Sequence, residues 1–203
     1  MGGKEMKKLE NRVAVITGGN RGIGKGIAVE FAKQGANVAI SYHRNSAAAA
    51  ETIAECEKYG VKAIAVQANV GNSADVRRMA DTVEKEFGFV DILVNNAGTI
   101  GLEVTMEDME EAEWDRVVNT DLKGVFLNCK YFIPLIKART DGTVGKIINI
   151  SSELSKKGRE CYGHYAASKG GINSLTMCLA LDPVDVVVVI GGPSPGGLDP
   201  HGQ

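Results

Sequence analysis

A glycine-rich turn between an apolar strand and a helix constrains this chain most. The segment reads Val13-Ala-Val-Ile-Thr-Gly-Gly-Asn-Arg-Gly-Ile-Gly24, and an amphipathic helical pattern follows at once. Strand, tight turn and helix in this order present backbone N–H groups and a positive helix end to a phosphate. We expect Gly18 to form the turn, Gly22 to admit a pyrophosphate and Gly24 to let the helix pack closely. An ordinary tight turn without a ligand has a similar composition, so the rest of the chain must decide.

Length and charge set the class of protein. The 203 residues suffice for a single α/β domain, which we expect to span residues 1–203. The 23 basic and 25 acidic residues nearly balance, which gives no indication of nucleic acid or an anionic membrane as a partner. The N-terminus is polar, and no apolar run is long enough to span a bilayer. We therefore expect a soluble, cytoplasmic protein.

The four cysteines do not form a metal or disulfide pattern. Cys56, Cys129, Cys161 and Cys178 show no CxxC spacing, and no histidine cluster accompanies them. We expect neither a metal site nor a disulfide framework, and most of these cysteines are interpreted as small buried residues. Cys161 is the exception because it lies near the candidate site in the sequence.

Short apolar runs alternate with helical patterns along the whole chain. The strands are expected at 13–16, 37–42, 61–66, 91–94, 145–150 and 186–190. The helices after the first are expected at 47–59, at 73–87 with Ser73 as its cap, at 114–137 and at 162–181. Nearly all-apolar strands are buried on both faces. The sequence therefore predicts an α/β fold, a Rossmann-type doubly wound parallel sheet with helices on both faces.

Polar residues gather where three of these strands end. The glycine-rich turn follows the first strand, Asn95-Asn-Ala-Gly98 follows the fourth, and Ser151-Ser152 follows the fifth. In a parallel sheet the carboxyl ends of the strands meet at one edge, where ligands bind. The sequence therefore predicts one ligand crevice at this edge.

Four motifs in order resemble the short-chain dehydrogenase/reductase family. They are Thr17-Gly-x-x-x-Gly-x-Gly24, Asn95-Asn-Ala-Gly98, Ser152 and Tyr165-x-x-x-Lys169. The resemblance covers about residues 10–180. Among its subfamilies the chain is similar to the 3-oxoacyl-carrier-protein reductases and the glucose 1-dehydrogenases, the latter through His164–Gly171.

The tyrosine and lysine suggest acid–base chemistry. Tyr165 and Lys169 lie one turn apart on a helix, so they share a face. A nearby ammonium should lower the pKa of the phenol and let Tyr165 act as general acid or base. The family spacing selects Ser152 over Ser151 as the group that orients the substrate oxygen. Tyr162 is a rival without a lysine partner. The alternative is a core tyrosine beside a solvated lysine.

The resemblance implies a nicotinamide cofactor, with Lys169 also holding its ribose. No acid that would favour NAD follows the second strand, whereas Arg21 and Arg44 could pair with a 2′-phosphate. We expect NADP to be preferred and NAD to be possible; the alternative is that both arginines are merely solvated. The expected cofactor contacts are Gly18, Asn20, Arg21, Gly22, Ile23, Gly24, Tyr42, His43, Arg44, Asn69, Val70, Asn96, Ala97, Gly98, Tyr165 and Lys169.

Three features depart from the family pattern. Asn69 stands where relatives commonly have an aspartate at the adenine. Asp121 stands where the family has its fourth catalytic residue, an asparagine that holds a water in a proton relay. Beyond about Leu181 the pattern is lost, so residues 182–203 are atypical and the domain looks shortened.

The resulting functional hypothesis is hydride transfer between NADP(H) and a carbonyl or secondary-alcohol substrate. Ser152, Tyr165, Lys169 and Asp121 are the expected catalytic residues. The alternative is a catalytically weak or inactive nucleotide-binding relative that acts as a regulatory or oligomer partner. By the resemblance, we expect a homodimer or homotetramer built through the two long helices.

Overall fold

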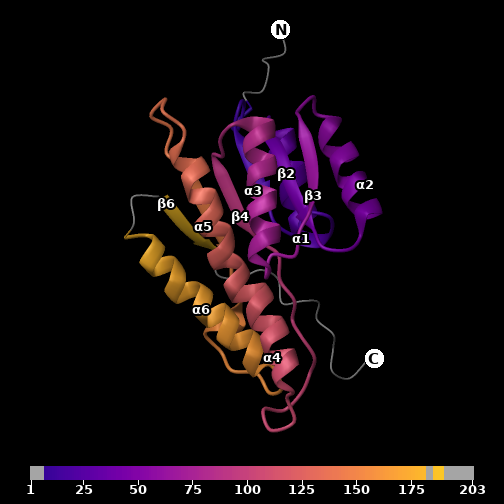
Figure 1. The fold of residues 1–203 in the computed structure, drawn as a ribbon, viewed down its shortest axis with the longest axis vertical. Coiled ribbons are helices and arrows are strands. Elements are labelled where there is room, and N and C mark those ends of the chain that lie inside the picture. The colour runs from indigo at the N-terminus through magenta and orange to yellow at the C-terminus, as the bar shows by residue number, and fades with distance from the viewer. Residues whose placement is uncertain (1–6, 182–184, 190–203) are drawn as a thin grey trace.

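A parallel six-stranded sheet forms the centre of the molecule (Figure 1). A computed structural model describes residues 7–181 and the backbone of residues 185–189. The strands are β1 Val13–Ile16, β2 Asn37–Tyr42, β3 Ala63–Gln67, β4 Ile92–Asn95, β5 Lys146–Ile150 and β6 Asp185–Val189. Their order is β3-β2-β1-β4-β5-β6, and every neighbouring pair is parallel. The predicted doubly wound sheet is confirmed. The expected end of the last strand, Ile190, lies outside the described residues, as does most of the atypical segment 182–203.

Helices connect the strands. They are α1 Gly22–Lys33, α2 Ser46–Glu57, α3 Ser73–Phe87, α4 Glu111–Val118, α5 Gly124–Lys137 and α6 Gly163–Leu179, with a short 3₁₀ turn, η2, at Glu153–Ser155. Asn72, and not Ser73, caps α3: its side chain accepts the backbone N–H of Asp75. The hydroxyl of Ser73 instead forms a hydrogen bond with Tyr131, 2.8 Å away.

The long helix predicted at 114–137 is not continuous. It begins earlier, at Glu111, and a π-helical segment, η1 at Asn119–Lys123, separates α4 from α5. Such a π-helical turn is rare and often marks a functional site. In this chain it contains Asp121, which is fully buried.

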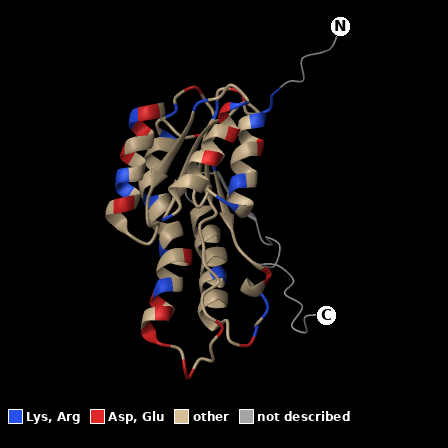
Figure 2. Ribbon diagram, turned by 90° about the vertical axis from the view of Figure 1, so that its right-hand side faces the viewer, with Lys and Arg blue, Asp and Glu red and all other residues tan. Residues whose placement is uncertain are grey.

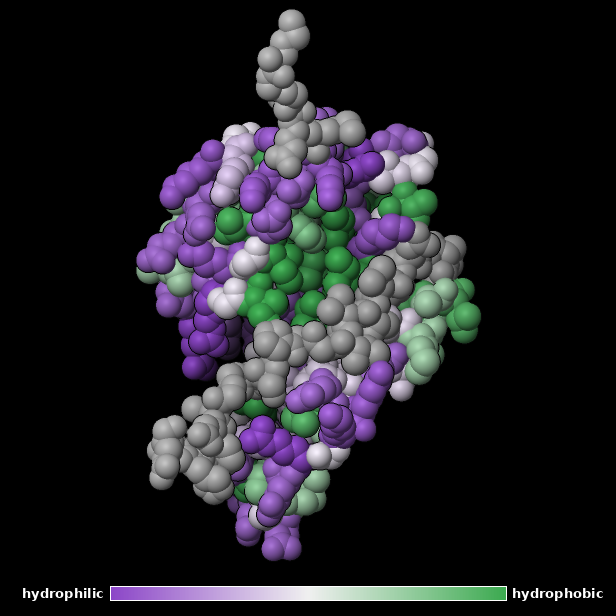
Figure 3. All heavy atoms as spheres, turned by 180° about the vertical axis from the view of Figure 1, so that it is seen from behind, coloured by the Kyte–Doolittle hydropathy of each residue, from purple (hydrophilic) through white to green (hydrophobic). Residues whose placement is uncertain are grey.

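Two apolar clusters cover the two faces of the sheet. Val15 and Leu93 belong to the cluster that packs against α3, α5 and α6, whereas Ile16 and Val94 belong to the cluster packed against α1 and α2. This alternation follows from the period of two along each strand. Viewed from behind, a patch of apolar side chains lies in the middle of the molecule, and polar side chains surround it at the top and the left (Figure 3).

The strand order reverses direction at β1. From β1 the chain winds toward β3, and the later strands β4 to β6 continue on the other side of β1. Such a switch point separates the loops at the carboxyl ends of β1 and β4, which is where this fold class binds ligands. The glycine-rich turn and residues 96–98 lie side by side at this switch point.

A buried carboxylate fastens the opposite edge of the sheet. Asp91, just before β4, accepts the backbone N–H of Val13 at 2.8 Å. Arg12 and Arg139 each place a guanidinium nitrogen 3.2 Å from the same carboxylate. Asp91 thus joins the starts of β1 and β4 to the loop before β5.

Acidic and basic side chains are intermixed over the surface (Figure 2). Within the part of the chain that the structure describes, no helix is long and apolar enough to cross a membrane. The same residues contain no group of three histidine, cysteine, aspartate or glutamate side chains placed to hold a metal ion. All four cysteines are free.

Candidate active site

The glycine-rich turn has the backbone geometry that its sequence predicts. Gly18 and Gly22 adopt positive φ angles of 64° and 54°. A Cβ at Gly22 would meet no atom within 4 Å, so the backbone there is open to an approaching group. A Cβ at Gly24 would overlap the carbonyl oxygen of Gly18, so α1 packs directly on the turn. This open backbone at the start of a helix fits a pyrophosphate.

Thr17 and Asn96 brace the turn, a role that we did not anticipate for either. The Thr17 hydroxyl accepts the backbone N–H groups of Asn96 and Ala97, each at 3.0 Å. The Asn96 side-chain amide donates to the carbonyls of Thr17 and Gly18 at 2.9 and 3.3 Å. The turn also requires a glycine at position 19, because a Cβ atom there would overlap the side chain of Ile40.

The other expected cofactor residues lie at the carboxyl ends of β1 to β4. Arg21 precedes α1 and, like His43 and Arg44 after β2, is exposed. The side-chain oxygen of Asn69, after β3, accepts the backbone N–H of Gly71 at 3.0 Å. Asn20, Val70, Ala97 and Gly98 lie in the same turns, whereas Ile23 lies in the first turn of α1 and Tyr42 ends β2.

The two serines after β5 have different roles. Ser151 donates a hydrogen bond from its hydroxyl to the backbone carbonyl of Lys169 at 3.2 Å and so fixes β5 to α6. Ser152 accepts the backbone N–H of Leu154 at 3.3 Å. Its hydroxyl also interacts with the phenol of Tyr165. The structure thus brings Ser152 and Tyr165 together and ties Ser151 to the backbone.

Tyr165 does not have the lowered pKa that we predicted. Its pKa is raised, first because the phenol is buried and further because Asp121 is negative, whereas the interaction with Ser152 lowers it. The Lys169 ammonium lies 5.5 Å from the centre of the Tyr165 ring. The rival Tyr162 donates its hydroxyl to Glu103 at 3.0 Å.

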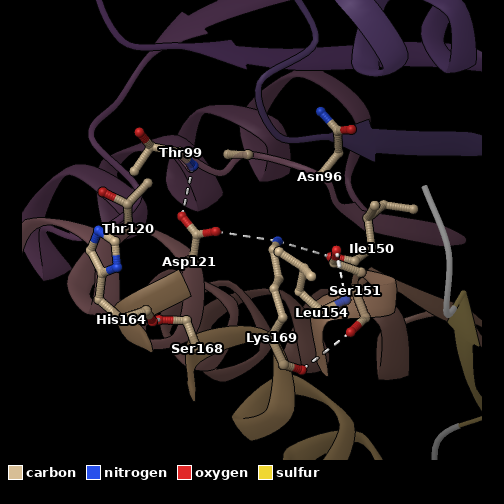
Figure 4. A network of polar contacts seen from close by, with 12 residues as sticks. Asn96, Thr99, Thr120, Asp121, Ile150, Ser151, Leu154, His164, Ser168 and Lys169 are labelled. Atoms are coloured by element: carbon tan, nitrogen blue, oxygen red, sulfur yellow. Dashed lines mark hydrogen bonds and ion pairs between the residues drawn. The ribbon is translucent and has the colours of Figure 1, made fainter. Parts of the chain in front are cut away.

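Lys169 is held between two acceptors (Figure 4). Its Nζ donates to the carbonyl of Ile150 at 3.2 Å and lies 3.3 Å from Oδ2 of Asp121. The second contact is a buried ion pair. The lysine charge is therefore paired inside the site.

Asp121 lies between the loop after β4 and Lys169 on α6. Its Oδ1 accepts the backbone N–H of Thr99 at 2.7 Å. A Cβ at Gly98 would lie 3.1 Å from Oδ2, so the glycine leaves space for the carboxylate. Burial raises the pKa of Asp121, and the nearby Lys169 and the Thr99 N–H oppose that rise.

The loop after β4 is attached to α4 and α6. Glu113 accepts the backbone N–H of Leu102 at 2.6 Å and pairs with Arg116 at 2.7 Å. These contacts lower the pKa of Glu113 to about 2, with the Arg116 hydrogen bond as the largest cause. The buried ring of His164 packs against Gly101, and its Nε2 lies 3.7 Å from Glu113. The loop is thereby held beside Tyr165.

Comparison with known proteins agrees with this geometry. The family model described as short chain dehydrogenase matches residues 12–201. The chain belongs to the short-chain dehydrogenase family. The match extends past Leu181, where the sequence pattern weakens. Glucose 1-dehydrogenase 2 of Bacillus subtilis is 34% identical over 95% of this chain and 74% of its own length. The 3-oxoacyl-[acyl-carrier-protein] reductase FabG of Staphylococcus epidermidis is 37% identical over 92% and 75%.

Solved structures of family members carry either cofactor. A short-chain dehydrogenase from Burkholderia cenocepacia in complex with NADP has a TM-score of 0.81 and 34% identity, covering 90% of this chain and 73% of that one. The NADH-dependent reductase A1-R′ complexed with NAD has a TM-score of 0.86 and 26% identity, covering 94% and 82%. The chain is therefore an NAD(P)-dependent oxidoreductase by family, and the choice between the two cofactors is a separate question.

Proposed function

We propose that the protein transfers a hydride between NADP(H) and a small carbonyl or secondary-alcohol substrate. The observation that carries this proposal is the meeting of Ser152, Tyr165 and Lys169 at the edge of the sheet that also carries the glycine-rich turn. Relatives named as dehydrogenases and reductases support the reaction class.

The cofactor has a site that fits it. The open backbone at Gly22 and the N-terminus of α1 would hold the pyrophosphate, and Lys169 would hold the nicotinamide ribose. When bound, the cofactor supplies or takes the hydride. Tyr42, Asn69 and Val70 would border the adenosine half.

The side chains of this protein manage the substrate oxygen. In carbonyl reduction the Ser152 hydroxyl donates a hydrogen bond to that oxygen, and the Tyr165 hydroxyl gives it a proton. In alcohol oxidation the Tyr165 oxygen takes the proton back. Lys169 places a positive charge beside the phenolate that reduction leaves on Tyr165.

Turnover of a generic diketone with NADPH tests the proposal. We expect Tyr165→Phe to abolish turnover, because the proton donor is lost, and to retain NADPH binding. Tyr162→Phe is the matched control: it removes a phenol on the same helix that contacts Glu103 and should retain most activity. Equal turnover by the Tyr165→Phe variant and the wild type would overturn the assignment of Tyr165.

We propose NADP as the preferred cofactor because the exposed Arg21 and Arg44 flank the turns after β1 and β2. A paired titration with NADPH and NADH, followed by melting temperature, measures the preference. Arg44→Ala should weaken NADPH binding about tenfold and leave NADH binding unchanged. Stronger binding of NADH by the wild type would overturn the preference.

A second candidate is a nucleotide-binding protein with little turnover, in a regulatory or oligomer role. The Asp121–Lys169 pair and the raised pKa of Tyr165 favour it. Cofactor binding without turnover of any carbonyl substrate up to alkaline pH would support this candidate.

We further propose that the protein works in the cytoplasm as a homodimer or homotetramer. Phe126 on α5, Met177 on α6 and Leu181 just after it are large apolar side chains exposed to solvent. Burying them against a second copy would remove this apolar surface from water. Light scattering with size-exclusion chromatography measures the assembly, and a monomer at micromolar concentration would contradict it.

A further inference from the structure

We propose that Asp121 is a positioning residue that pairs with Lys169 and cancels the lysine charge at Tyr165. The acid–base step therefore operates at a higher pH than it would with an uncharged residue at position 121. The inference rests on the proposed function for its catalytic meaning. The ion pair itself is a property of the free protein and can be tested without turnover.

The geometry fixes Asp121 against Lys169. The carboxylate is held at Oδ1 by the Thr99 N–H at 2.7 Å, which leaves Oδ2 directed at the lysine ammonium 3.3 Å away. The π-helical segment η1 carries Asp121 into the interior, and Gly98 leaves room for it. Neither partner can turn away easily, because both side chains are almost completely buried.

Because Asp121 and Lys169 are buried, their charges act strongly on the ionisation of neighbouring groups. A charge in the interior acts over longer distances than one in water, because little solvent screens it. A lone Lys169 ammonium beside Tyr165 would favour the phenolate. With Asp121 ionised beside it, the pair has no net charge, and Asp121 itself disfavours the phenolate.

The other titratable groups near the site are Arg116, Glu113 and His164. Arg116 on α4 acts on Asp121 at longer range and is paired with Glu113. The His164 ring on α6 lies 3.7 Å from Glu113. Ser152, from the turn after β5, is the uncharged contact of Tyr165. Asp121 and Lys169 form the buried ion pair next to Tyr165, and burial of the phenol is the largest cause of its raised pKa.

Titration of the free protein tests the proposal. Tyrosinate absorbance is recorded from neutral pH to about pH 11, and the curve of Tyr165→Phe is subtracted to isolate Tyr165. We expect Asp121→Asn to move this curve to lower pH by about one unit, because the carboxylate charge is lost while an oxygen for Thr99 remains. Asp115→Asn is the matched control, since it removes the same charge from an exposed position on α4 and should not move the curve.

The outcomes separate this inference from the proposed function. A Tyr165 curve in Asp121→Asn that coincides with wild type, or moves to higher pH, overturns the inference. If Asp121→Asn fails to fold, Asp121→Ser replaces it, with the same expected direction. In alcohol oxidation, the acidic limb of kcat/KM should move by the same amount in the variant. If no turnover is found, the proposed function fails and the titration alone decides the charge pairing.

Discussion

A Cβ atom on Gly24 would overlap the backbone carbonyl oxygen of Gly18, so α1 and the glycine-rich turn pack without an intervening side chain. We predict that Gly24→Ala weakens NADPH binding at least about tenfold, because the turn must move away from the N-terminus of α1. Isothermal titration calorimetry measures the change.

Gly26→Ala is the matched control on the same helix. A Cβ there would meet no atom within 4 Å, and alanine is a better helix former by up to about 1 kcal/mol. This variant should bind NADPH like the wild type and melt at the same or a higher temperature. Equal binding by the two alanine variants would contradict the packing argument.

Substitution of the two serines after β5 should have different effects, one on activity and the other on stability. We predict that Ser152→Ala lowers kcat by about a hundredfold, since the hydrogen bond to the substrate oxygen is lost, with little change in melting temperature. Ser151→Ala should lower the melting temperature, because the contact to the Lys169 carbonyl is lost. Steady-state kinetics and thermal melting on both variants check this, and a loss of activity in Ser151→Ala alone would reverse the assignment.

Asp91 should be a major stability residue. Asp91→Ala leaves the buried Val13 N–H without its acceptor and both arginines without their buried partner, at a cost of about 2 kcal/mol. Urea unfolding measures the loss. Asp141→Ala is the control, because it removes an exposed carboxylate that also pairs with Arg139, and it should cost much less.

Glu113 should make stability depend on pH in the acid range. Its pKa falls from 4.5 to about 2 on folding, so its contribution is complete above about pH 5 and is lost as the pH falls toward 2. Glu113→Gln should therefore be less stable than the wild type by about 1 kcal/mol at neutral pH, a value that we reduced because Arg116 is half-exposed to solvent. Near pH 2 the two proteins should have nearly equal stability. A constant difference at all pH values would show that the charge is not the cause.

The sequence predicted the parallel sheet and the edge that carries the site, because short apolar strands and glycine positions are local signals. It did not predict η1, since a π-helical segment depends on packing around Asp121 and not on a local pattern. It also misjudged the direction of the Tyr165 pKa, because the burial of the phenol and the nearby Asp121 carboxylate, which raise that pKa, are both set by tertiary packing. The bracing of the turn by Thr17 and Asn96 was missed for the same reason.

The position of Asp91 has a consequence for how this protein can change. Its contacts lie at the edge of the sheet where β1 and β4 start, a strand's length from the turns that follow them. Effects of substitutions at such separated places add nearly independently. Substitutions that alter the substrate range at the carboxyl ends of the strands can lower the stability of the protein. Stabilising substitutions near Asp91, at the opposite edge of the sheet, could restore that stability without changing the altered chemistry.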